Sequence, residues 1–599
     1  AAEGSGCFSA VGGMVRYTTG EDGAITITGC DDTVTEIVIP DSIDGIKVTA
    51  VNEFAFQGNE VLASITFPAG MKKIGYGAFT SCTKLAKADF SACTDELEID
   101  GSAFQNDTAL SSIAFPEKLI KITEYAFYGC SNLTSVSFKS GNVDLSIGSN
   151  AFATDAKLAS VTFPGSLTDL GNNAFDYCDN LTAVDFSACT KLTTVGSSAF
   201  ANSGLKGVDF SACTKLTTIG EYAFYQNSAL TSVKFPESLT ELGQYAFASC
   251  SALEGADFSK TSVKTIREGT FDESGIKSLK LSDSTTDIEY NAFVSCTALT
   301  SLELGKGLRT IGWQSFSHSG ITSLKLPDSV ESIGSDAFGN CTSLTSIEWP
   351  DNEKFTTVQG FEYCESLPVE EFNEAVALPS VTTIGESAFS GCSFKSVTIP
   401  ANIRVIGDGA FYGMPNMTSL VILPGTASIG VHAFKKCTGL AGKTVVLPET
   451  VEAVKGGAFA DCFIEHEPEG TEGYTYTGIT VKFLNRDFKL APYDSNSYNM
   501  VTIDDVNYEN PFDMGVAVIH AYETDSEGNT SMLKKLYDVV KDETVGSQKR
   551  YIFEPIIDKA SYSISGIIPS GADVHIFQNE EELPVTLSDN YFEAKAEGE

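Results

Sequence analysis

The stretch Glu124–Phe138 reads EYAFYGCSNLTSVSF, and the stretch Glu221–Phe235 reads EYAFYQNSALTSVKF. The two are nearly the same fifteen residues, so the chain contains an internal repeat. Aligned on the phenylalanine that usually follows an alanine, the chain shows eighteen recurrences that lie 22 to 28 residues apart. These repeat phenylalanines are Phe56, Phe79, Phe104, Phe127, Phe152, Phe175, Phe200, Phe224, Phe247, Phe271, Phe293, Phe316, Phe338, Phe361, Phe389, Phe411, Phe434 and Phe459.

Each repeat unit has a common pattern, which the segment EYAFYQNSALTSVKFPESLTELG (Glu221–Gly243) shows. The run L-T-S-V-x-F alternates between outward and inward side chains, as a short strand does. The later Leu-Gly or Ile-Gly pair indicates a turn in which glycine allows either a positive φ or a close approach of two backbones. A unit of about 23 residues cannot bury its own apolar face, so the units are expected to stack into a solenoid with a continuous core.

The composition is that of a folded and strongly acidic chain. Of the 599 residues, 42% are hydrophobic and 20% are charged, and 79 acidic against 39 basic residues give a net charge of −40. Such a surface repels phosphate backbones and anionic lipids, which disfavours nucleic acid and membrane surfaces as partners. No run of eighteen apolar residues exists, so we expect no transmembrane segment. The opening residues AAEGSGCFSA have neither an initiator methionine nor an apolar signal core, which is typical of a processed or trimmed chain.

The repeat pattern has a counterpart in a known family. Units of the form AFxxCxxLTSVxFPxSLTxIG resemble the BspA-like leucine-rich repeats of bacteria, a class also described from Treponema. The run ITITGCDDTVTEIVIPDSIDGIKVTAV (Ile25–Val51) resembles the unit that precedes such an array, and the resemblance extends to about Cys462. It implies a right-handed, curved leucine-rich-repeat solenoid with short parallel strands. It also implies a secreted or surface-displayed bacterial protein, since the best-known members are adhesins that bind host matrix proteins, plasma proteins or other bacteria.

The domain organisation follows from where the repeat begins and ends. Residues 1–50 are expected to form an N-terminal cap unit, and residues 51–466 a solenoid of about 18 units. Short alternating runs in residues 467–560 predict a β-rich domain, with one short helix in NTSMLKKLYDVVKD (Asn529–Asp542). Residues 561–599 resemble the first strands of a carboxypeptidase-regulatory-like β-sandwich that breaks off early, as a truncated module would.

The cysteines follow the repeat and do not form a disulfide framework. Ten of the fifteen lie three residues after a repeat phenylalanine, where other units carry Asn, Asp, Ser or Met, so Cys130 and Asn227 fill the same small, partly polar turn position. In the first half, cysteine tends to skip a unit, which places neighbouring thiols about 10 Å apart, whereas a disulfide needs Cα atoms within about 7 Å. We expect thirteen cysteines to be buried and reduced. Cys7 and Cys30 lie outside the pattern and could pair with each other.

No arrangement of residues indicates catalysis or metal binding. The five histidines share no spacing, and the chain contains no H-E-x-x-H, G-x-S-x-G, C-x-x-C or dinucleotide-binding motif. Gly442, Lys443 and Thr444 resemble the end of a P-loop, but Cys437 stands where that motif requires glycine. We therefore expect no enzymatic activity, no cofactor and no metal.

A row of charges marks the outward position near the end of each strand. From Lys234 to Glu348 the signs alternate from unit to unit. This strip comprises Lys234, Asp257, Lys280, Glu303, Lys325 and Glu348. Opposite charges on adjacent strands stabilise a sheet, so the strip fits a ladder that keeps the strands in register. It also fits a polar recognition surface on the concave face of a solenoid, and one strip could serve both roles.

Two irregularities are further candidates for partner binding. Trp313 occupies a position where other units carry Glu221 or Tyr76, so its ring is expected to be exposed as a candidate anchor. The long spacing between Phe361 and Phe389 contains an acidic insertion. Insertions in solenoids often map to binding loops, although drifted repeats produce the same signal.

Together these features favour a non-enzymatic, exported bacterial protein, secreted or on the cell surface. Its solenoid is expected to bind an extracellular protein or glycan, and the chain to be a monomer. One alternative is a structural stalk that displays other modules. Another is the targeting region of a larger enzyme.

Overall fold

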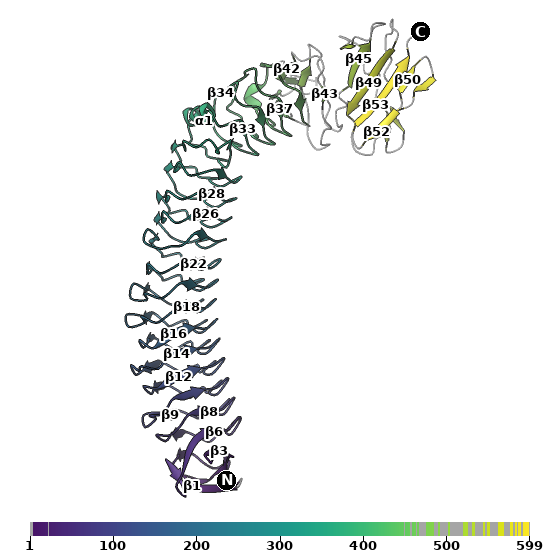
Figure 1. The fold of residues 1–599 in the computed structure, drawn as a ribbon. Coiled ribbons are helices and arrows are strands. Elements are labelled where there is room, and N and C mark those ends of the chain that lie inside the picture. Colours follow the sequence, from purple (N-terminus) through teal and green to yellow (C-terminus); the bar gives the residue numbers. More distant parts are fainter. Residues whose placement is uncertain are drawn as a thin grey trace. The chain divides into compact units, whose positions relative to one another are not determined.

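The computed structural model describes residues 4–462 apart from positions 22, 449, 456–457 and 460, and beyond residue 462 it describes only the strands β40 to β53. The chain forms a β-solenoid of about 19 turns, which confirms the solenoid that the repeat predicts (Figure 1). Two units are described separately below. Unit 1 comprises Ala1–Ile321 and Lys325–Val330, and unit 2 comprises Thr322–Leu324 and Glu331–Glu599.

An antiparallel meander forms the start of unit 1. β1 (Gly4–Ala10) pairs with β2 (Gly13–Thr19), and β2 pairs with β3 (Ile25–Cys30). β3 then pairs in parallel with β6 (Ile46–Val51), which β5 (Ser42–Ile43) joins in a hairpin. The first coil therefore has a paired neighbour in place of an open strand edge, as a cap unit requires.

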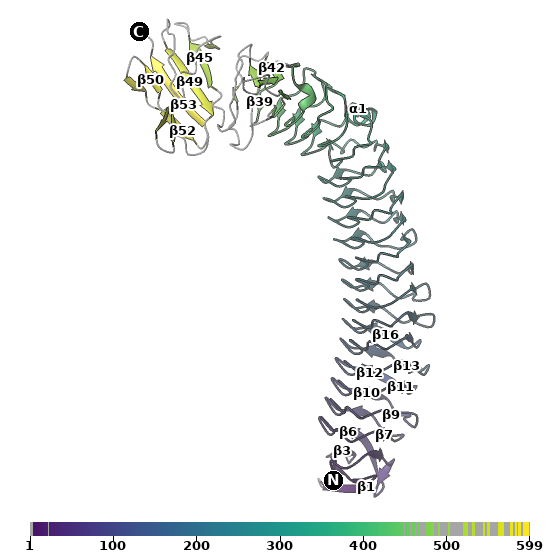
Figure 2. The ribbon, with the colours of Figure 1, turned by 180° about the vertical axis from the view of Figure 1, so that it is seen from behind.

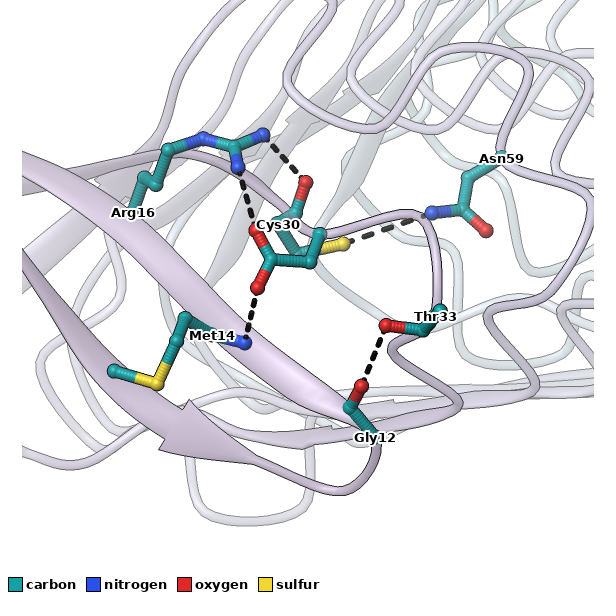
Figure 3. A network of polar contacts seen from close by, with 7 residues as sticks. Gly12, Met14, Arg16, Cys30, Thr33 and Asn59 are labelled. Carbon is teal, nitrogen blue, oxygen red and sulfur yellow. Dashed lines mark hydrogen bonds and ion pairs between the residues drawn. The ribbon is translucent and has the colours of Figure 1, made fainter.

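A polar network ties the meander to the turn that follows β3 (Figure 3). Nη1 of Arg16 lies 3.0 Å from Oδ1 of Asp31, and Nη2 of Arg16 donates to the carbonyl of Cys30. Oδ2 of Asp31 accepts the backbone N–H of Met14 at 2.9 Å. The ion pair is about half exposed, so its main effect is to fix the geometry of the turn, not to stabilise the fold strongly.

Two rows of short parallel strands run along unit 1, one strand of each row per coil (Figures 1 and 2). The first row comprises β4 (Glu36–Val38), β7 (Ser64–Thr66), β9 (Lys87–Asp89), β11 (Ser112–Phe115), β13 (Ser135–Phe138), β15 (Ser160–Thr162), β17 (Ala183–Asp185), β19 (Gly207–Asp209), β21 (Ser232–Lys234), β23 (Gly255–Asp257), β25 (Ser278–Lys280) and β27 (Ser301–Glu303). The second row comprises β6, β8 (Lys73–Ile74), β10 (Leu97–Ile99), β12 (Leu119–Ile122), β14 (Leu145–Ile147), β16 (Leu167–Leu170), β18 (Thr194–Val195), β20 (Thr218–Ile219), β22 (Glu241–Leu242), β24 (Thr265–Ile266), β26 (Asp287–Ile288) and β28 (Thr310–Ile311). β29 (Ser323–Lys325) lies where the units meet in sequence.

The first row corresponds to the strand that the L-T-S-V-x-F run predicts, whereas the second row corresponds to the Ile-Gly pair, which was expected to form only a turn. Its strands are mostly two residues long, too short to show an alternation in sequence. The glycine that follows is needed for close approach and not for a positive φ. A Cβ on Gly75 would lie 2.7 Å from the backbone carbon of Asn52, and one on Gly148 would lie 2.7 Å from that of Thr123.

The repeat phenylalanines form the centre of the core. From Phe56 to Phe316 in unit 1, neighbouring rings stack at centroid distances of 4.9 to 5.5 Å and interplanar angles of 3° to 13°. A second file of phenylalanines packs edge-on against them, as Phe67 does against Phe79 at 6.1 Å. Such aromatic pairs contribute about 0.5–1.5 kcal/mol each beyond the apolar area that they bury. Because every coil adds a ring to the stack, neighbouring coils stabilise one another.

In several coils, the residue three positions after the repeat phenylalanine donates the same hydrogen bond to the preceding coil. Sγ of Cys130 donates to the carbonyl of Phe104 in the preceding coil at 3.1 Å. Nδ2 of Asn227 donates to the equivalent carbonyl of Phe200 at 2.7 Å, and Oγ of Ser203 to that of Phe175 at 3.0 Å. Cysteine, asparagine and serine therefore replace one another because each is a small side chain that donates a hydrogen bond.

All fifteen cysteines are free thiols, and the thirteen that follow the repeat are buried, as expected. Cys7 and Cys30 are also unpaired, so the disulfide left open between them is not formed in this structure. Cys7 is exposed and lies opposite Arg16 on β2, whereas Cys30 is buried and lies opposite Val15. The buried thiol of Cys30 accepts a hydrogen bond from Nδ2 of Asn59 at 3.6 Å.

Two coils place a carboxyl group at the same buried turn position. Oδ1 of Asp107 accepts the backbone N–H of Cys82 at 2.7 Å, but Oδ2 of Asp107 and both carboxyl oxygens of Asp155 make no hydrogen bond. Burial raises the pKa of both carboxyl groups well above the ordinary range. A protonated carboxyl can donate to a carbonyl as Cys130 does, and a carboxylate cannot.

In unit 2 the long spacing between Phe361 and Phe389 contains a helix, α1 (Val369–Ala377). Phe372 on α1 is buried, and its ring lies 5.3 Å from that of Phe389 and 5.7 Å from that of Phe411. The insertion was a candidate binding loop, but its apolar face packs into the core. Its two acidic residues in the first turn lie at the end of the helix that favours negative charge.

The other elements of unit 2 continue the same two rows. The first row comprises β31 (Ser346–Glu348), β34 (Ser396–Ile399), β36 (Ser419–Ile422), β38 (Thr444–Leu447), β42 (Ile479–Phe483) and β44 (Val501–Ile503), with a 3-10 turn, η1 (Thr438–Leu440), before β38. The second row comprises β30 (Ser332–Ile333), β32 (Thr357–Val358), β33 (Thr383–Ile384), β35 (Val405–Ile406), β37 (Ser428–Ile429), β39 (Ala453–Val454) and β43 (Lys489–Leu490). Both rows run past residue 466, because parallel pairing requires an alternating strand but not the Ala-Phe pair.

The last described strands pair in antiparallel fashion. β40 (Ile464–His466) and β41 (Thr475–Thr477), β47 (Glu543–Val545) and β48 (Gln548–Arg550), and β50 (Ile576–Gln578) and β51 (Glu581–Leu583) form three two-stranded sheets. A five-stranded sheet has the order β46 (Thr530–Met532), β45 (Ile519–Thr524), β49 (Ser561–Ile567), β53 (Tyr591–Glu597) and β52 (Val585–Ser588).

The five-stranded sheet includes part of the segment in which a helix was expected. Residues 530–532 are a strand, although the helix of Asn529–Asp542 was expected there, and residues 533–542 lie outside the described residues. The β-sandwich and the domain limits remain predictions.

Candidate interaction surface

The strip residues of unit 1 lie at one equivalent position on successive strands. Lys234, Asp257, Lys280 and Glu303 are the last residues of β21, β23, β25 and β27, and each follows a residue that faces the core. Asp257 pairs with Lys280 across β23 and β25, and Lys280 pairs with Glu303 across β25 and β27. The alternation of charge seen in the sequence is therefore an alternation between neighbours in space.

Intramolecular contacts engage the charges of this strip. Nζ of Lys234 lies 2.7 Å from Oδ2 of Asp209, and Nζ of Lys280 lies 3.0 Å from Oε2 of Glu303. The hydrogen bond to Glu303 raises the pKa of Lys280. These contacts fit the first of the two roles considered for the strip, in which opposite charges keep neighbouring strands in register.

The aspartate of the strip also has a local structural role. Oδ1 of Asp257 accepts the backbone N–H of Ser259 at 2.9 Å, and hydrogen bonding from Ser259 lowers the pKa of Asp257. Asp209 makes the equivalent bond to Ser211, also at 2.9 Å. This Asx turn ends the strand and starts the next bend in the coil.

The other two members of the strip lie on different units. Lys325 belongs to unit 1 and Glu348, at the end of β31, belongs to unit 2. Both engage in interactions within the chain, so neither is a free charge. Their role in binding remains a prediction.

Trp313 is exposed, as expected, but it lies on another edge of the coil. Its side chain is 49% exposed, and it follows β28 of the second row, three residues before Phe316. We define the turn edge as the residues two and three positions before each repeat phenylalanine of unit 1. The strip residues end strands of the first row, so Trp313 and the strip do not form one contiguous motif along the chain.

Neighbouring coils place three tyrosines on the turn edge with Trp313. Tyr222 and Tyr290 are exposed, and Tyr245 is half-buried. The rings of Tyr222 and Tyr245 stack at 5.1 Å with an interplanar angle of 8°. We call Tyr222, Tyr245, Tyr290 and Trp313 the aromatic row.

Glu268 holds the middle of the aromatic row in place. It lies on the intervening coil, three residues before Phe271, and its Oε1 accepts the hydroxyl of Tyr245 at 2.6 Å. Its Oε2 accepts the hydroxyl of Tyr290, so one carboxylate joins tyrosines from the coils on either side. The hydrogen bond to Glu268 raises the pKa of Tyr245. The tyrosine rings are thus fixed before any partner arrives.

Sequence reasoning identified Trp313 but not the three tyrosines. The signal is present, because each repeat phenylalanine in this region has an aromatic or acidic residue two or three positions before it. It is hard to see because Tyr222 and Tyr245 lie two positions before their phenylalanine, whereas Tyr290 and Trp313 lie three positions before theirs. The turn brings both positions to one edge.

The described residues hold no arrangement typical of a metal centre. Among them, no group of three or more His, Cys, Asp and Glu side chains is placed to hold a metal ion. No helix in the part of the chain that the structure describes is long and apolar enough to cross a membrane.

The repeat, the two rows of strands and the phenylalanine stack agree with a comparison of sequence families. The model of the BspA type leucine rich repeat region (6 copies) matches residues 28–145, 97–226, 145–274, 264–376 and 371–467, well over half of the chain. The chain belongs to the BspA-type leucine-rich-repeat family. This confirms the resemblance inferred from the repeat consensus. No curated protein matches the chain.

Solved structures of bacterial leucine-rich-repeat proteins are similar to this BspA-type chain. One from Bacteroides ovatus is 23% identical with a TM-score of 0.44, over 73% of this chain and 94% of that one. A leucine rich cell surface protein from Faecalibacterium prausnitzii is 22% identical with a TM-score of 0.31, over 76% and 92%. A leucine rich repeat protein from T. pallidum is 24% identical with a TM-score of 0.26, over 40% and 87%.

Proposed function

We propose that this BspA-type protein is a non-enzymatic interaction protein that binds an extracellular protein or glycan through its solenoid. The observation that supports this proposal is the aromatic row, in which Glu268 fixes two tyrosines beside the half-exposed Trp313. Trp and Tyr are the residues most enriched at the energetic centres of interfaces. Rings that are already ordered lose little conformational entropy on binding, which favours affinity.

The aromatic row is a better candidate for the primary contact than the strip. Partner binding to the strip would compete with the pairs that Lys234 and Lys280 already make with Asp209 and Glu303. The exposed rings, by contrast, lose water on binding without breaking a charged contact. The strip then contributes to steering and to the choice of partner, which are the usual effects of exposed charge.

The proposed location is the bacterial cell surface or the medium. Membership of the BspA-type family supports this location, because such proteins are typically surface or secreted proteins of bacteria. Fourteen of the fifteen thiols are buried, which protects them from oxidation and makes them compatible with such a location. The proposal further takes the protein to act as a monomer, since a net charge of −40 opposes self-association.

The test is a binding screen of the full chain against arrays of matrix proteins, plasma proteins and glycans at low and high salt. The aromatic row predicts a saturable hit that the Trp313→Ala variant weakens by about tenfold or more. Tyr177→Ala is the matched control, because Tyr177 is an exposed aromatic on the other side of its repeat phenylalanine. Equal weakening by both variants, or none by either, would contradict the aromatic row as the site.

Two alternatives give different results in the same screen. A structural stalk gives no saturable hit, since its function lies in the modules that it displays. The targeting region of a larger enzyme gives a hit, but the full-length gene then encodes catalytic sequence next to the solenoid. The charge-reversal variant Lys280→Glu with Lys325→Glu tests the strip, and a change in salt dependence without loss of binding supports its steering role.

A further inference from the structure

Unit 2 has a hollow where its coils turn toward the repeat phenylalanine. The depression has a volume of about 540 Å³, within the range of about 300–1,000 Å³ for sites that bind small ligands. Its lining includes four carboxylic residues and two tyrosines from four successive coils. These are Asp336, Glu362, Tyr363, Glu386, Asp408 and Tyr412. We call it the acidic depression.

One lining residue of the acidic depression carries a buried carboxyl group. Glu362 follows Phe361 directly and is only 4% exposed. Its Oε1 accepts the hydroxyl of Ser335 at 3.0 Å, and its Oε2 accepts the backbone N–H of Asp336 at 2.9 Å. Each carboxyl oxygen has two lone pairs, so both oxygens retain acceptor capacity after these bonds.

The charge of the lining is predominantly negative. None of the lining residues, all of which the structure describes, is lysine or arginine, and the basic member is His432. Two lysines reach the margin. Nζ of Lys455 lies 3.8 Å from Oδ1 of Asp408, and Nζ of Lys436 lies over the ring of Tyr412, 5.5 Å from its centroid. Burial raises the pKa of Glu362 to about 8, so this carboxyl is mostly protonated at neutral pH and the negative charge of the lining comes from Asp336, Glu386 and Asp408.

Tyr363 and Tyr412 give the acidic depression aromatic faces that can bind a cation. Lys436 shows that the face of Tyr412 already accepts a positive charge within the distance typical of a cation–π contact. Tyr363 is exposed, and its ring lies directly over Gly391 in the next coil, where any Cβ would collide with the ring. The position of this ring is therefore set by the fold.

The carboxylates and tyrosines of the acidic depression favour a planar cation as the ligand. An anion is repelled by the carboxylates, and a neutral sugar gains no ionic attraction from them. No metal-binding arrangement of three or more His, Cys, Asp and Glu side chains exists in the described part of the chain. A guanidinium group is planar, forks its N–H donors toward carboxylates and stacks on aromatic faces, and it is less strongly hydrated than an ammonium group.

We propose that the acidic depression binds an arginine side chain presented by a partner polypeptide. The site goes beyond the proposed function, because it lies in unit 2 and shares no residue with the aromatic row of unit 1. Either proposal can fail while the other stands.

The experiment measures binding of the full chain to fluorescent peptides that differ at one position. The probes carry a single arginine between glycine and serine residues, and matched peptides carry lysine or citrulline, the uncharged analogue of arginine. We expect saturable one-to-one binding of the arginine peptide. It should be about tenfold tighter than binding of the citrulline peptide and several-fold tighter than binding of the lysine peptide. Equal binding of the arginine peptide and either of the others would overturn the proposal.

Variants distinguish the site from the general attraction of an acidic protein for cations. Glu386→Gln with Asp408→Asn removes two exposed carboxylates of the depression and should weaken the arginine peptide about tenfold. Glu237→Gln with Glu254→Gln removes the same charge from exposed positions of unit 1 and should change affinity less than about twofold. Equal effects of the two pairs would mean that only net charge matters, which contradicts the site. Tyr177→Ala, which removes an exposed ring outside both proposed sites, should leave this affinity unchanged.

Discussion

The interior and the exterior of the same coils carry two polar rows that respond differently to change. Inside, Cys130, Ser203 and Asn227 each donate to the carbonyl of a repeat phenylalanine in the preceding coil. Outside, Lys234 pairs with Asp209 across two strands at 2.7 Å. Water can replace a lost partner on the outside but not on the inside, so a polar group left unpaired costs far more in the interior.

This difference shows that the fold restricts the residue type at the interior turn position more than at the exterior strand position. The interior position favours a small hydrogen-bond donor and accepts several residue types, although Met414 shows that a buried side chain without a donor also fits. The exterior position requires only that neighbours do not repel each other. Surfaces such as the strip, the aromatic row and the acidic depression can therefore change between coils at little cost to stability. Asp107 and Asp155 are exceptions among these coils, because an aspartate can donate a hydrogen bond there only while its carboxyl group keeps a proton.

The largest expected effect comes from breaking the interior rule at Asn227. Nδ2 of Asn227 donates to the carbonyls of Phe200 at 2.7 Å and Phe224 at 3.0 Å. Asn227→Asp must either place a buried carboxylate against both carbonyls or keep a proton at pH 7 that the unfolded chain releases, so we expect the free energy of unfolding at pH 7 to fall by about 3–4 kcal/mol. Urea denaturation followed by circular dichroism measures the change.

The control for this variant keeps the hydrogen bond and changes the residue. Asn227→Cys copies the coils of Cys82 and Cys130, whose thiols donate to the preceding phenylalanine carbonyl at 3.0 and 3.1 Å. We expect it to lose less than about 1.5 kcal/mol. If the aspartate and cysteine variants were equally destabilised, size and not hydrogen-bond donation would govern the position.

The next largest effect is expected at Asp155, where a substitution should increase stability by an amount that depends on pH. Asp155→Asn supplies a donor that does not depend on a retained proton, so we expect it to raise the free energy of unfolding by about 1–3 kcal/mol near pH 8. The raised pKa of Asp155 means that the folded chain keeps a proton that the unfolded chain has released. The stability of the unmodified protein therefore falls as pH rises above the unfolded pKa of about 3.9, and the asparagine variant lacks this loss.

The measurement is a series of urea titrations of both proteins between pH 5 and pH 8. The difference between them should grow as pH rises. Asp179→Asn, at an exposed position of the same unit, is the control and should show no such trend. A difference that stays constant or shrinks with pH would mean that Asp155 is ionised in the folded chain.

The features that sequence could predict are those that recur with a fixed chemical role. The Ala-Phe pair predicts the solenoid because a stack of rings needs one large residue per coil at a constant position. The exchange of Cys130 for Asn227 identifies the turn position, but the carbonyl that both residues contact appears only when two coils are stacked. The second row of strands was missed because a strand of two residues, such as β22, has no alternation to show.

The candidate sites were less predictable because they depend on contacts between coils. The strip was visible in sequence, but the pairing of Lys280 with Glu303 depends on exact register. Glu268 resembles any exposed glutamate until the tyrosines on both sides are placed. Glu362 looks like one acid among 79 acidic residues, and only the stacking of neighbouring coils makes it a buried lining residue of a hollow.

A smaller effect is expected on the exterior, at Lys234. Lys234→Gln removes the ion pair with Asp209 but leaves Asp209 bonded to the N–H of Ser211. Both side chains are more than half exposed, so we expect the free energy of unfolding to change by less than about 1 kcal/mol. High salt should remove most of this difference, because it screens exposed charges. A loss as large as that of Asn227→Asp would contradict the contrast between interior and exterior rows.

The smallest expected change in stability comes from the residue on which the proposed function most depends. Trp313→Ala should alter the free energy of unfolding by no more than about 0.5 kcal/mol, because the ring is half exposed and the phenylalanine stack does not include it. Tyr177→Ala, which removes another exposed ring, should behave in the same way. Urea titrations of both variants, compared with their binding in the partner screen, decide the point. A Trp313 variant that keeps its stability and loses its partner assigns the ring to binding, whereas one that loses stability assigns it to the fold.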